Sequence, residues 1–261
     1  MKNIISAIEE IVRGGKLWRQ WKVLADAQLG RRFQKSILGK GWELVNFVLT
    51  VTVLGYLFSI LFNREFESYW LYLTAGFSTW LLISSVLSEG ANVFVRNMVF
   101  VRELPLPMSI YLWALLWKCI QAYSINLLFA ICLGLWVNGP SASLFLVIPG
   151  FLLIVIISYF MIMIVGVVGA RFRDAIHFVP NILRGVFFLT PILWTLDRRE
   201  DLAWLVDYNP FYYILEIVRA PLLGVTPEIE VYYVVVGMLI IVVSFALMLY
   251  AAVHKKMVYW L

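Results

Sequence analysis

Long, unbroken stretches of apolar residues constrain this chain more than any other feature. Hydrophobic residues occupy 62% of its 261 positions and charged residues only 14%, against about 45–50% and roughly 25% in soluble domains. A water-soluble fold of this length could not bury so much apolar surface. Several stretches reach the length of about 20 residues that a helix needs to cross a bilayer. The sequence therefore predicts an integral membrane protein that does not bind nucleic acid, despite a net charge of +5.

Six membrane-spanning helices are predicted, because the apolar segments are continuous and do not alternate with polar residues as barrel strands do. The predicted spans lie at about 41–62, 70–88, 110–137, 144–170, 178–196 and 232–253. We expect an all-α fold in which residues 41–261 form one transmembrane domain. Residues 1–40 precede it as a cytoplasmic segment of interfacial helices.

The distribution of Lys and Arg predicts the orientation of these spans. The N-terminal segment, the loops after the second and fourth spans and the C-terminal tail together hold fifteen basic residues, whereas the opposite side holds four. Because basic residues concentrate on the cytoplasmic side, both termini are expected there. The first forty residues include nine basic ones and no long apolar core, which is not the pattern of a cleavable signal peptide.

The N-terminal segment has the pattern of two helices. Isoleucines at helical spacing precede Gly14 and Gly15, where we expect the first helix to break. The second helix places Trp18 and Trp21 beside basic residues, which is typical of an amphipathic helix in the headgroup region. Two interpretations remain open here: an ordinary membrane anchor, or an interfacial helix that meets a cytoplasmic partner.

The predicted cytoplasmic loop at 89–107 contains a short amphipathic stretch that ends before Pro105 and Pro107. Because proline cannot continue a helix, we expect a short helix along the membrane face followed by a rigid elbow. The loop could simply connect two spans. Alternatively, Arg96, Asn97 and Arg102 suit contact with another protein.

The segment at 197–231 is expected on the opposite side of the membrane. Asn209 and Pro210 begin a largely apolar stretch at 211–223 that is too short to cross a bilayer. Irregular backbone at membrane depth must be covered by protein or face water. The pattern favours a short pair of helices that are re-entrant or lie on the surface.

Reactive groups in the patterns that enzymes use do not occur in the sequence. We find no paired carboxylates inside the spans, no HExxH, no GxxxxGK[ST] loop and no glycine-rich dinucleotide fingerprint. The spans are nearly free of ionisable residues at mid-depth, which argues against ion-coupled transport. Any uphill transport must therefore draw its energy from a partner.

Cys119 and Cys132 are too far apart on one helix to form a disulfide.

Two stripes combine aromatic rings with hydroxyl or amide groups on one helical face. Such a mixture suits sugar rings, which have an apolar face and a polar rim, but polar packing between helices explains the same stripes and is the favoured interpretation. The stripe in the second span consists of Trp80, Ser84 and Ser88, and the stripe in the third span of Trp113, Trp117, Gln121 and Ser124.

Motifs spread over nearly the whole chain resemble the membrane subunit of type-two ABC exporters, in the branch that exports lipid-linked polysaccharides such as O antigens, capsules and teichoic acids. The order and spacing of these motifs carry the resemblance more than any one of them does. They are the basic run Arg31-Arg32 leading to Trp42, Gly76 with Trp80, Asn97 to Arg102 with Pro105, Arg171 to Asp174, Thr190-Pro191-Ile192, and Asn209-Pro210 with Arg219. The family often has a proline soon after the Trp, where this chain has Val45-Asn46-Phe47.

The resemblance implies a homodimer in a bacterial cytoplasmic (inner) membrane, with a translocation channel at the dimer interface. It also implies a separate ABC ATPase that docks on the cytoplasmic side and binds ATP and Mg²⁺, so no cofactor or metal site is expected in this chain. The substrate would be a long glycan on an undecaprenyl-type lipid, with O antigen as the first candidate. The alternatives are an ABC permease for a drug or small lipid, and an integral-membrane enzyme that processes lipid or sugar intermediates.

Candidate site residues follow from these interpretations. For coupling to the ATPase they are Arg96, Asn97, Arg102, Arg171, Arg173 and Asp174. Arg31 and Arg32 either attract the pyrophosphate of the lipid-linked substrate or anchor the chain by the positive-inside effect. The two aromatic stripes are candidates for the glycan channel, and Asn209, Pro210 and Arg219 for the segment that shapes its exit.

Overall fold

A computed structural model describes residues 2–32, 36, 38–103, 105–195, 203–254 and 256–260. These residues form helices joined by short connections, with no strand among them. The side chains of Lys2, Arg31, Arg32, Arg102, Ala203 and Val258 lie outside the described part, as do Arg198, Arg199 and Lys255, which entered the prediction of orientation. The all-α prediction is confirmed for the described residues.

Within the described residues, five helices are long and apolar enough to cross a membrane. A short 3-10 helix, η1 (Ala142–Leu146), leads directly into one of them, α8. The five are α3 (Gly41–Leu61), α4 (Phe66–Gly90), α7 (Ser109–Asn138), η1 with α8 (Val147–Arg171), and α12 (Ile229–Val253). The chain is therefore a multi-pass membrane protein.

The predicted fifth span is shorter than the others. Its helix, α9 (Ala175–Leu189), has 15 residues, a length of about 22 Å at 1.5 Å per residue, against a hydrocarbon core of about 30 Å. The helix ends because Thr190 is extended, with φ −94° and ψ 134°, and the following Pro191 disfavours the helical conformation at Thr190. The count of six spans therefore stays a prediction that depends on α9 and the residues after it.

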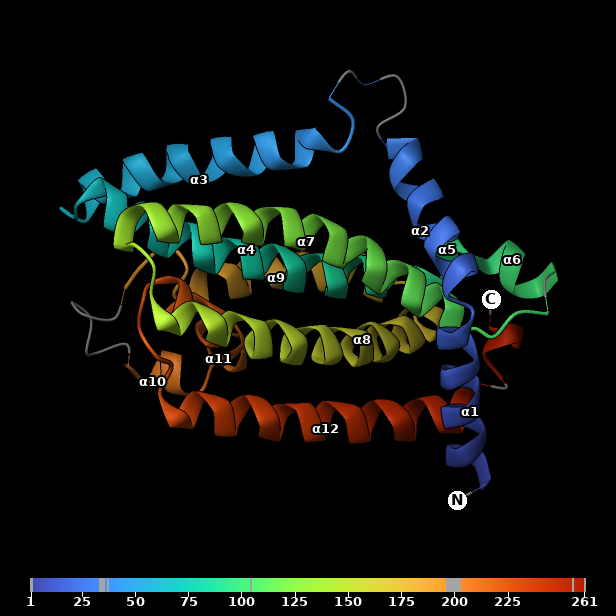
Figure 1. Ribbon diagram of the computed structural model, residues 1–261. Helices are drawn as coiled ribbons and strands as arrows, with labels where there is room; N and C mark the ends of the chain where they lie inside the picture. Colours follow the sequence, from blue (N-terminus) through green and yellow to red (C-terminus); the bar gives the residue numbers. More distant parts are fainter. Residues whose placement is uncertain are drawn as a thin grey trace.

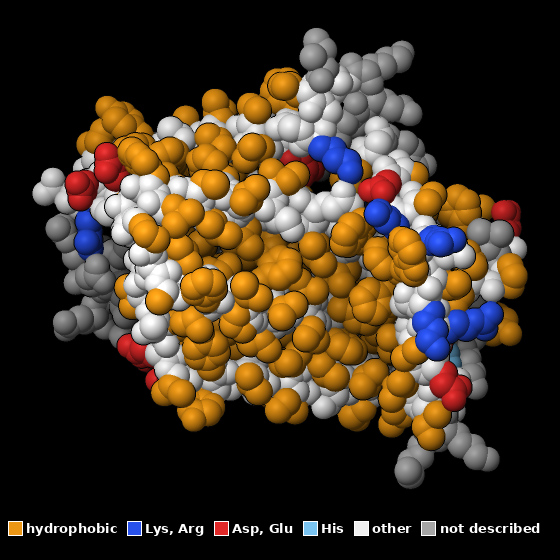
Figure 2. Space-filling view, viewed as in Figure 1, with side chains coloured by type: hydrophobic (Ala, Val, Ile, Leu, Met, Phe, Trp, Pro, Cys, Tyr) orange, Lys and Arg blue, Asp and Glu red, His pale blue; other side chains and the backbone are white. Residues whose placement is uncertain are grey.

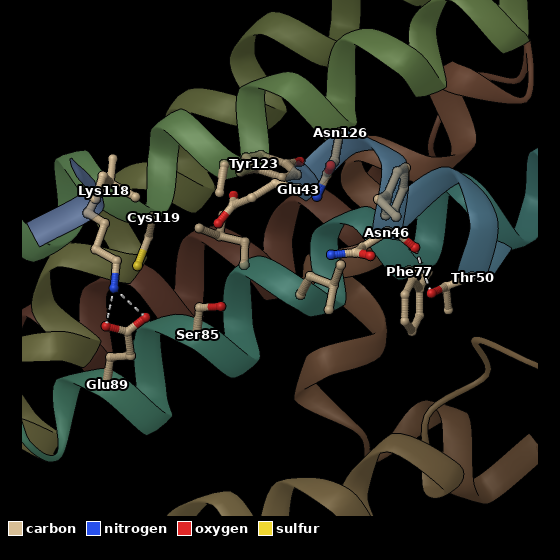
Figure 3. A pocket seen from close by; sticks show the side chains of 15 residues that line it. Glu43, Asn46, Thr50, Phe77, Ser85, Glu89, Lys118, Cys119, Tyr123 and Asn126 are labelled. Atoms are coloured by element: carbon tan, nitrogen blue, oxygen red, sulfur yellow. Dashed lines mark hydrogen bonds and ion pairs between the residues drawn. The ribbon is translucent and has the colours of Figure 1, made fainter. Parts of the chain in front are cut away.

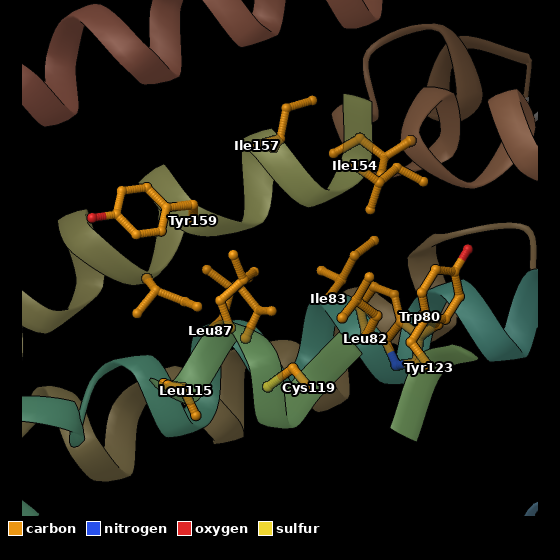
Figure 4. Packing of buried hydrophobic residues seen from close by; sticks show 14 of the residues in the cluster. Trp80, Leu82, Ile83, Leu87, Leu115, Cys119, Tyr123, Ile154, Ile157 and Tyr159 are labelled. Atoms are coloured by element: carbon orange, nitrogen blue, oxygen red, sulfur yellow. The ribbon is translucent and has the colours of Figure 1, made fainter. Parts of the chain in front are cut away.

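The long helices run side by side, and α4 lies at the centre of the bundle (Figure 1). It packs against α3, α7, α8 and α9, and it is the most buried of the five spans, whereas α3 and α12 are the least buried. Leu82, Ile83 and Leu87 of α4 meet Leu115 and Cys119 of α7 in the core (Figure 4). Helical spacing places these α4 side chains on one face.

Two N-terminal helices cross one end of the bundle, α1 (Lys2–Lys16) and α2 (Trp18–Arg32). The predicted division into two helices is present, but the break lies at Leu17, just after Gly14 and Gly15, because α1 continues to Lys16 and α2 begins at Trp18. Gly14 lies against Ser109 of α7 so closely that a Cβ at this position would overlap the Ser109 hydroxyl. The glycine therefore serves close approach to α7 instead of ending the helix.

In the part of the chain that the structure describes, four shorter α-helices connect the longer ones. The loop predicted as a single short helix is divided at Asn97 into α5 (Val93–Arg96) and α6 (Met98–Glu103). The predicted pair after α9 is present as α10 (Ala203–Asp207) and α11 (Pro210–Leu222). Helix α11 packs against α4, α8 and α12, so it lies against the spans. A 3-10 turn, η4 (Met257–Tyr259), follows α12.

The visible surface is a broad apolar face between two charged ends (Figure 2). Most of the Lys and Arg side chains in this view lie over the end formed by α1, α2 and α6, where both termini also lie (Figures 1 and 2). We call this the basic end, and the end formed by α10 and α11 the α11 end. An apolar face with charges confined to its ends is what a bilayer requires of a spanning protein.

Candidate translocation path and coupling surfaces

Glycines on α8 position the elbow where the chain leaves α4 for α5. A Cβ on Gly169 would overlap the backbone carbonyl of Ala91, and a Cβ on Gly166 would come within 2.9 Å of Val93 and 3.0 Å of Phe94. Only glycine lets the elbow pack this closely on α8. The predicted coupling segment is therefore held against a membrane-spanning helix and is not a free loop.

Asn97 and Arg96 have different roles in this elbow. Asn97 is buried and donates from Nδ2 to the Val93 carbonyl at 2.7 Å, so it fixes the end of α5. Arg96 is exposed and donates to Glu89 at 3.2 Å and to the Gln28 side chain at 3.0 Å, which joins α5 to α4 and α2. The third residue predicted here, Arg102, has no described side chain.

Lys118 and Glu89 form an ion pair that the sequence analysis did not single out. The Lys118 ammonium on α7 donates to Glu89 Oε1 at 2.8 Å, and Glu89 also accepts from Arg96. The Lys118 side chain is 13% exposed. A single lysine inside a long apolar segment was the available signal, because such a charge needs a partner.

Arg171, Arg173 and Asp174 are exposed at the turn after α8. The Arg171 guanidinium lies 5.3 Å from the ring of Trp260 and 6.0 Å from that of Phe172, which are cation–π distances. This places Arg171 beside the C-terminal turn. The three residues thus share the basic end with α5 and α6.

Three members of the α7 stripe face the N-terminal helices. The Trp113 indole donates to the Ile11 carbonyl at 3.4 Å and stacks at 6.4 Å on Trp21. Trp117 contacts the same Trp21 at 5.8 Å, and Gln121 donates to Asp26 at 3.2 Å. Ser124, the fourth member, is exposed. These contacts within one chain fit the helix-packing interpretation for Trp113, Trp117 and Gln121.

The α4 stripe lines a groove between α4 and α9. Trp80, Ser84 and Ser88 lie along one wall of this space of about 390 Å³, and Arg184 and Phe187 of α9 lie along the other. The Trp80 ring is 5% exposed and packs at 5.7 Å from the Phe187 ring. The structure thus brings an aromatic ring and two hydroxyl side chains together in one groove.

Asn209 and Pro210 join α11 to the end of α9. The Asn209 Oδ1 accepts from the Phe211 backbone N–H at 3.0 Å, as an N-cap does, and Pro210 occupies the first turn, where its missing N–H costs nothing. The Asn209 Nδ2 donates to Thr190 Oγ1 at 3.0 Å. The Asn209 side chain therefore caps the start of α11 and bonds it to Thr190, the residue that follows the end of α9.

Arg219 is buried at the α11 end, at 3% exposure. It donates to Glu216 at 2.8 Å, to the Tyr72 hydroxyl at 2.9 Å and to the Pro191 carbonyl at 2.6 Å. Burial lowers the pKa of the guanidinium, but Tyr72 and Glu216 more than offset it, so the net pKa is raised and the charge is kept. Burial, with a smaller effect of Glu216, raises the pKa of Tyr212 to about 12.

The Arg219 cluster joins three elements: α11, the N-terminal half of α4, and the break after α9. The sequence analysis identified Arg219 but missed its partners Glu216, Tyr72 and Pro191. The spacing of Glu216 and Arg219, three residues apart on a helix, was a usable signal. The contact of Arg219 with Tyr72 of α4 had no signal in the sequence, because the two residues are 147 positions apart.

Glu10 of α1 is a second residue that sequence reasoning missed. Its carboxylate accepts from the Ser109 backbone N–H at 3.0 Å and from the Tyr250 hydroxyl at 2.7 Å. It therefore satisfies a free N–H in the first turn of α7 and at the same time holds the end of α12. One side chain joins α1, α7 and α12.

The fold and these contacts define a multi-pass membrane protein whose α4–α5 elbow is packed against α8 at the basic end. The chain belongs to the ABC-2 type transporter family, which its sequence matches over residues 19–223. It is a transport subunit of that family, whose members pair with an ABC ATPase subunit.

Three relatives share most of the length of this chain. One O-antigen export system permease protein RfbA from Klebsiella pneumoniae is 25% identical over 204 residues, covering 75% of this chain and 77% of the relative. A second from the same organism is 24% identical over 199 residues, with 75% and 77% covered. The RfbA of Myxococcus xanthus is 22% identical over 179 residues, with 68% and 69% covered. The chain is an ABC-2 permease homologous to O-antigen export permeases.

Proposed function

We propose that this chain is the permease subunit of an ATP-driven exporter that moves a lipid-linked polysaccharide, O antigen in the first instance, across the bacterial inner membrane. Two copies form a channel at their interface, and both termini face the cytoplasm. The observation that carries this proposal is similarity to O-antigen export permeases over about three quarters of the chain. The fifteen-to-four bias in basic residues supports the orientation.

The basic end is the proposed docking surface for the ATPase dimer, which supplies ATP and Mg²⁺ chemistry. Its elbow is suited to transmit motion, because Gly166 and Gly169 hold α5 against α8 and Arg96 links it to α4 and α2. Arg171, Arg173 and Asp174 extend this surface, and Arg102 belongs to it by its place in α6. Arg31 and Arg32 are proposed to attract the pyrophosphate of the substrate near the first span.

The groove between α4 and α9 is the proposed contribution of this chain to the glycan path. Trp80 lines the wall beside the Phe187 ring, and Ser84 and Ser88 offer hydroxyls, which together match the apolar face and polar rim of a sugar. At the α11 end, Asn209, Pro210 and Arg219 hold α11 against the end of α9 and so shape the exit.

A genetic experiment tests this function directly. Deleting the gene should leave glycan inside the cell and remove it from the surface, and a plasmid copy should restore it. Surface glycan is measured with a glycan-specific antibody, and intracellular lipid-linked glycan by extraction. Unchanged surface glycan together with altered sensitivity to drugs would favour a permease for drugs or small lipids instead.

A biochemical experiment tests the division of labour. The purified chain in lipid nanodiscs should hydrolyse no ATP, and addition of its ATPase partner should produce hydrolysis that depends on both proteins. The control is the ATPase alone at the same concentration. Hydrolysis by the purified chain alone would contradict the proposal that the energy source is a separate subunit.

A further inference from the structure

A groove at the basic end separates α2 from α6. Residues of α2 line one side, Phe100 of α6 lines the other, and Leu106 with Ile110 and Tyr111 of α7 complete the lining. Its volume of about 500 Å³ falls within the range of ligand sites, about 300 to 1,000 Å³. Ile110 and Tyr111 belong to the first turn of a spanning helix, so the groove lies where the chain enters the bilayer. No residue of its lining has a role in the proposed export function.

The groove exists because α6 stands away from the bundle. Figure 1 shows α6 projecting beyond α2 at the basic end, and among the described elements α6 packs chiefly against α5. Val23 of α2, Phe100 of α6 and Leu106 line the groove and are all exposed. Exposed apolar side chains that gather in one concave place mark an interaction site.

The Tyr111 hydroxyl is an independent sign of an occupant. Tyr111 lines the groove and is 3% exposed, yet its hydroxyl has no hydrogen-bond partner among the described residues. Buried polar groups without a partner are rare and call for an explanation. Because a phenol O–H donates, the ester oxygen of an acyl lipid in the groove would satisfy it.

Arg19 gives the groove a positive charge that no described carboxylate pairs with. Lys118, by contrast, is paired with Glu89 in the cleft between α3, α4 and α7 (Figure 3). The Arg19 guanidinium lies 5.4 Å from the ring of Trp18, and its only described partner is this ring. The described lining of the groove contains no carboxylate. Charge complementarity therefore favours an anion.

The groove combines one cation with an otherwise almost apolar lining, and this combination narrows the ligand. A small free anion would leave the apolar walls uncovered, and a neutral lipid would leave Arg19 without a counter-charge. Trp18 beside Arg19 is typical of a helix at the level of lipid headgroups. Basic groups beside the cytoplasmic ends of spans bind anionic lipid headgroups. The ligand that fits both features is an acyl lipid with an anionic head.

We propose that the groove between α2 and α6 binds an anionic phospholipid of the phosphatidylglycerol class. One acyl chain lies along Val23, Leu24 and Phe100, the phosphate lies beside Arg19, and an ester oxygen accepts from Tyr111. This lipid is a resident component of the membrane and is distinct from the exported substrate. It fills the space between α6 and α2. Its assignment to the cytoplasmic leaflet rests on the proposed function, whereas the chemistry of the site does not.

Binding is tested by thermal unfolding of the full chain in dodecyl maltoside with added lipid. The probe is dioleoyl phosphatidylglycerol, which at about ten times its Kd should raise the Tm by roughly 3–6 °C. Three comparison probes should each raise the Tm by less than a third of that shift. Dioleoyl phosphatidylcholine has the same chains without net charge, glycerol phosphate has no chains, and undecaprenyl phosphate has a phosphate but no acyl ester.

Variants locate the bound lipid. Arg19→Gln should raise the Kd for phosphatidylglycerol about fivefold. Tyr111→Phe should raise it about two- to tenfold, while the Tm without lipid stays equal or rises, because the hydroxyl has no described partner to lose. The control is Arg13→Gln, which removes the same charge from α1 outside the groove lining and should leave the Kd unchanged.

Four results would overturn the proposal: no shift with phosphatidylglycerol, an equal shift with phosphatidylcholine, an equal shift with undecaprenyl phosphate, or an unchanged Kd in Arg19→Gln and Tyr111→Phe. Loss of ATPase assembly in Phe100→Ala without any lipid shift would assign the groove to the protein partner instead. The gene-deletion experiment is separate. Glycan export without a Tm shift removes the lipid site and leaves the export function, and a Tm shift without glycan export does the reverse.

Discussion

At the scale of single residues, the structure gives specific partners to the buried Arg219 and the half-buried Glu10. Arg219 is satisfied by a carboxylate, a hydroxyl and a backbone carbonyl, and Glu10 by a backbone N–H and a tyrosine hydroxyl. A charge in an apolar interior costs several kcal/mol unless it is paired and hydrogen-bonded. Both residues lie where separate helices meet, so their bonds also determine how those helices are joined.

Replacing Arg219 should be among the most damaging single changes. Arg219→Met leaves Glu216 and the Pro191 carbonyl without their donor, and should lower the free energy of unfolding by about 3–5 kcal/mol. The measurement is unfolding in detergent followed by near-ultraviolet circular dichroism. Arg219→Met with Glu216→Gln removes both charges and should recover part of the loss. If the single and double variants are equally unstable, the ion pair is not the cause.

Glu10 allows a matched comparison with its neighbour. Glu10→Ala removes the acceptor for Ser109 and Tyr250 and should cost about 1–3 kcal/mol. Glu9 is exposed, so Glu9→Ala makes the same charge change and should stay within about 0.5 kcal/mol. Thermal unfolding of both variants is the measurement. Equal Tm values for the two would show that Glu10 does not hold α1 to α7 and α12.

At the scale of elements, glycines decide where helices touch. Gly166 and Gly169 of α8 contact the α4–α5 elbow at the basic end. Gly150 of α8 and Gly134 of α7 contact the backbone of α11. A Cβ added to Gly150 would lie 2.8 Å from the Ile217 carbonyl, and one added to Gly134 would lie 2.9 Å from the Leu222 carbonyl. Small residues at such contacts let helices approach closely in membranes. Glycines that allow close backbone approach therefore hold both the elbow and α11, at opposite ends of the bundle.

Adding one methyl group tests the seat of the elbow. Gly169→Ala places a Cβ on the Ala91 carbonyl and should cost about 1–3 kcal/mol or displace α5. The control is Gly237→Ala in α12, where no neighbouring atom lies within 4 Å, and it should be neutral or stabilising by up to about 1 kcal/mol. Tm and surface glycan are both measured. Normal export and Tm for Gly169→Ala would show that the elbow has room to shift.

At the scale of the whole molecule, the two ends differ in chemistry. The basic end gathers most of the Lys and Arg visible in Figure 2 together with the elbow. At the α11 end, Asn209 bonds to Thr190, and the buried Arg219 bonds to the Pro191 carbonyl. An exposed basic surface suits a partner in water. This asymmetry supports docking of the ATPase at the basic end.

The coupling role of the elbow is tested with the partner present. Arg96→Gln with Arg102→Gln should reduce ATP hydrolysis that depends on the permease several-fold, because the elbow loses its link to α4 and α2. Insertion in the membrane should be unchanged. The comparison pair, Arg13→Gln with Lys16→Gln, removes the same charge from α1 of the same end, and a smaller loss of hydrolysis there would show that the link made by Arg96, and not the total charge of the basic end, carries the coupling. Normal hydrolysis by the Arg96 and Arg102 variant would refute the coupling role.

Much of the architecture was predictable because the bilayer imposes simple rules on sequence. Continuous apolar segments predict spans wherever they are long enough, and five such helices are present. The predicted fifth span is less clear because α9 stops before Pro191 after 15 residues. The break predicted at Gly14 and Gly15 lies at Leu17, and local propensity does not record that Gly14 is needed for close approach to Ser109.

The sequence by itself determined that the chain spans a membrane, that it is helical, and that it resembles ABC exporter permeases. Composition and motif order can be read directly from the sequence, without knowing which residues are in contact. Only the tertiary structure decided which helix covers each of the two aromatic stripes. Trp113 and Trp117 have the same pattern as Trp80, yet they pack under α2, while Trp80 lines the groove with α9. Periodicity places residues on one face of a helix, but the neighbouring helix that covers that face comes from distant parts of the chain.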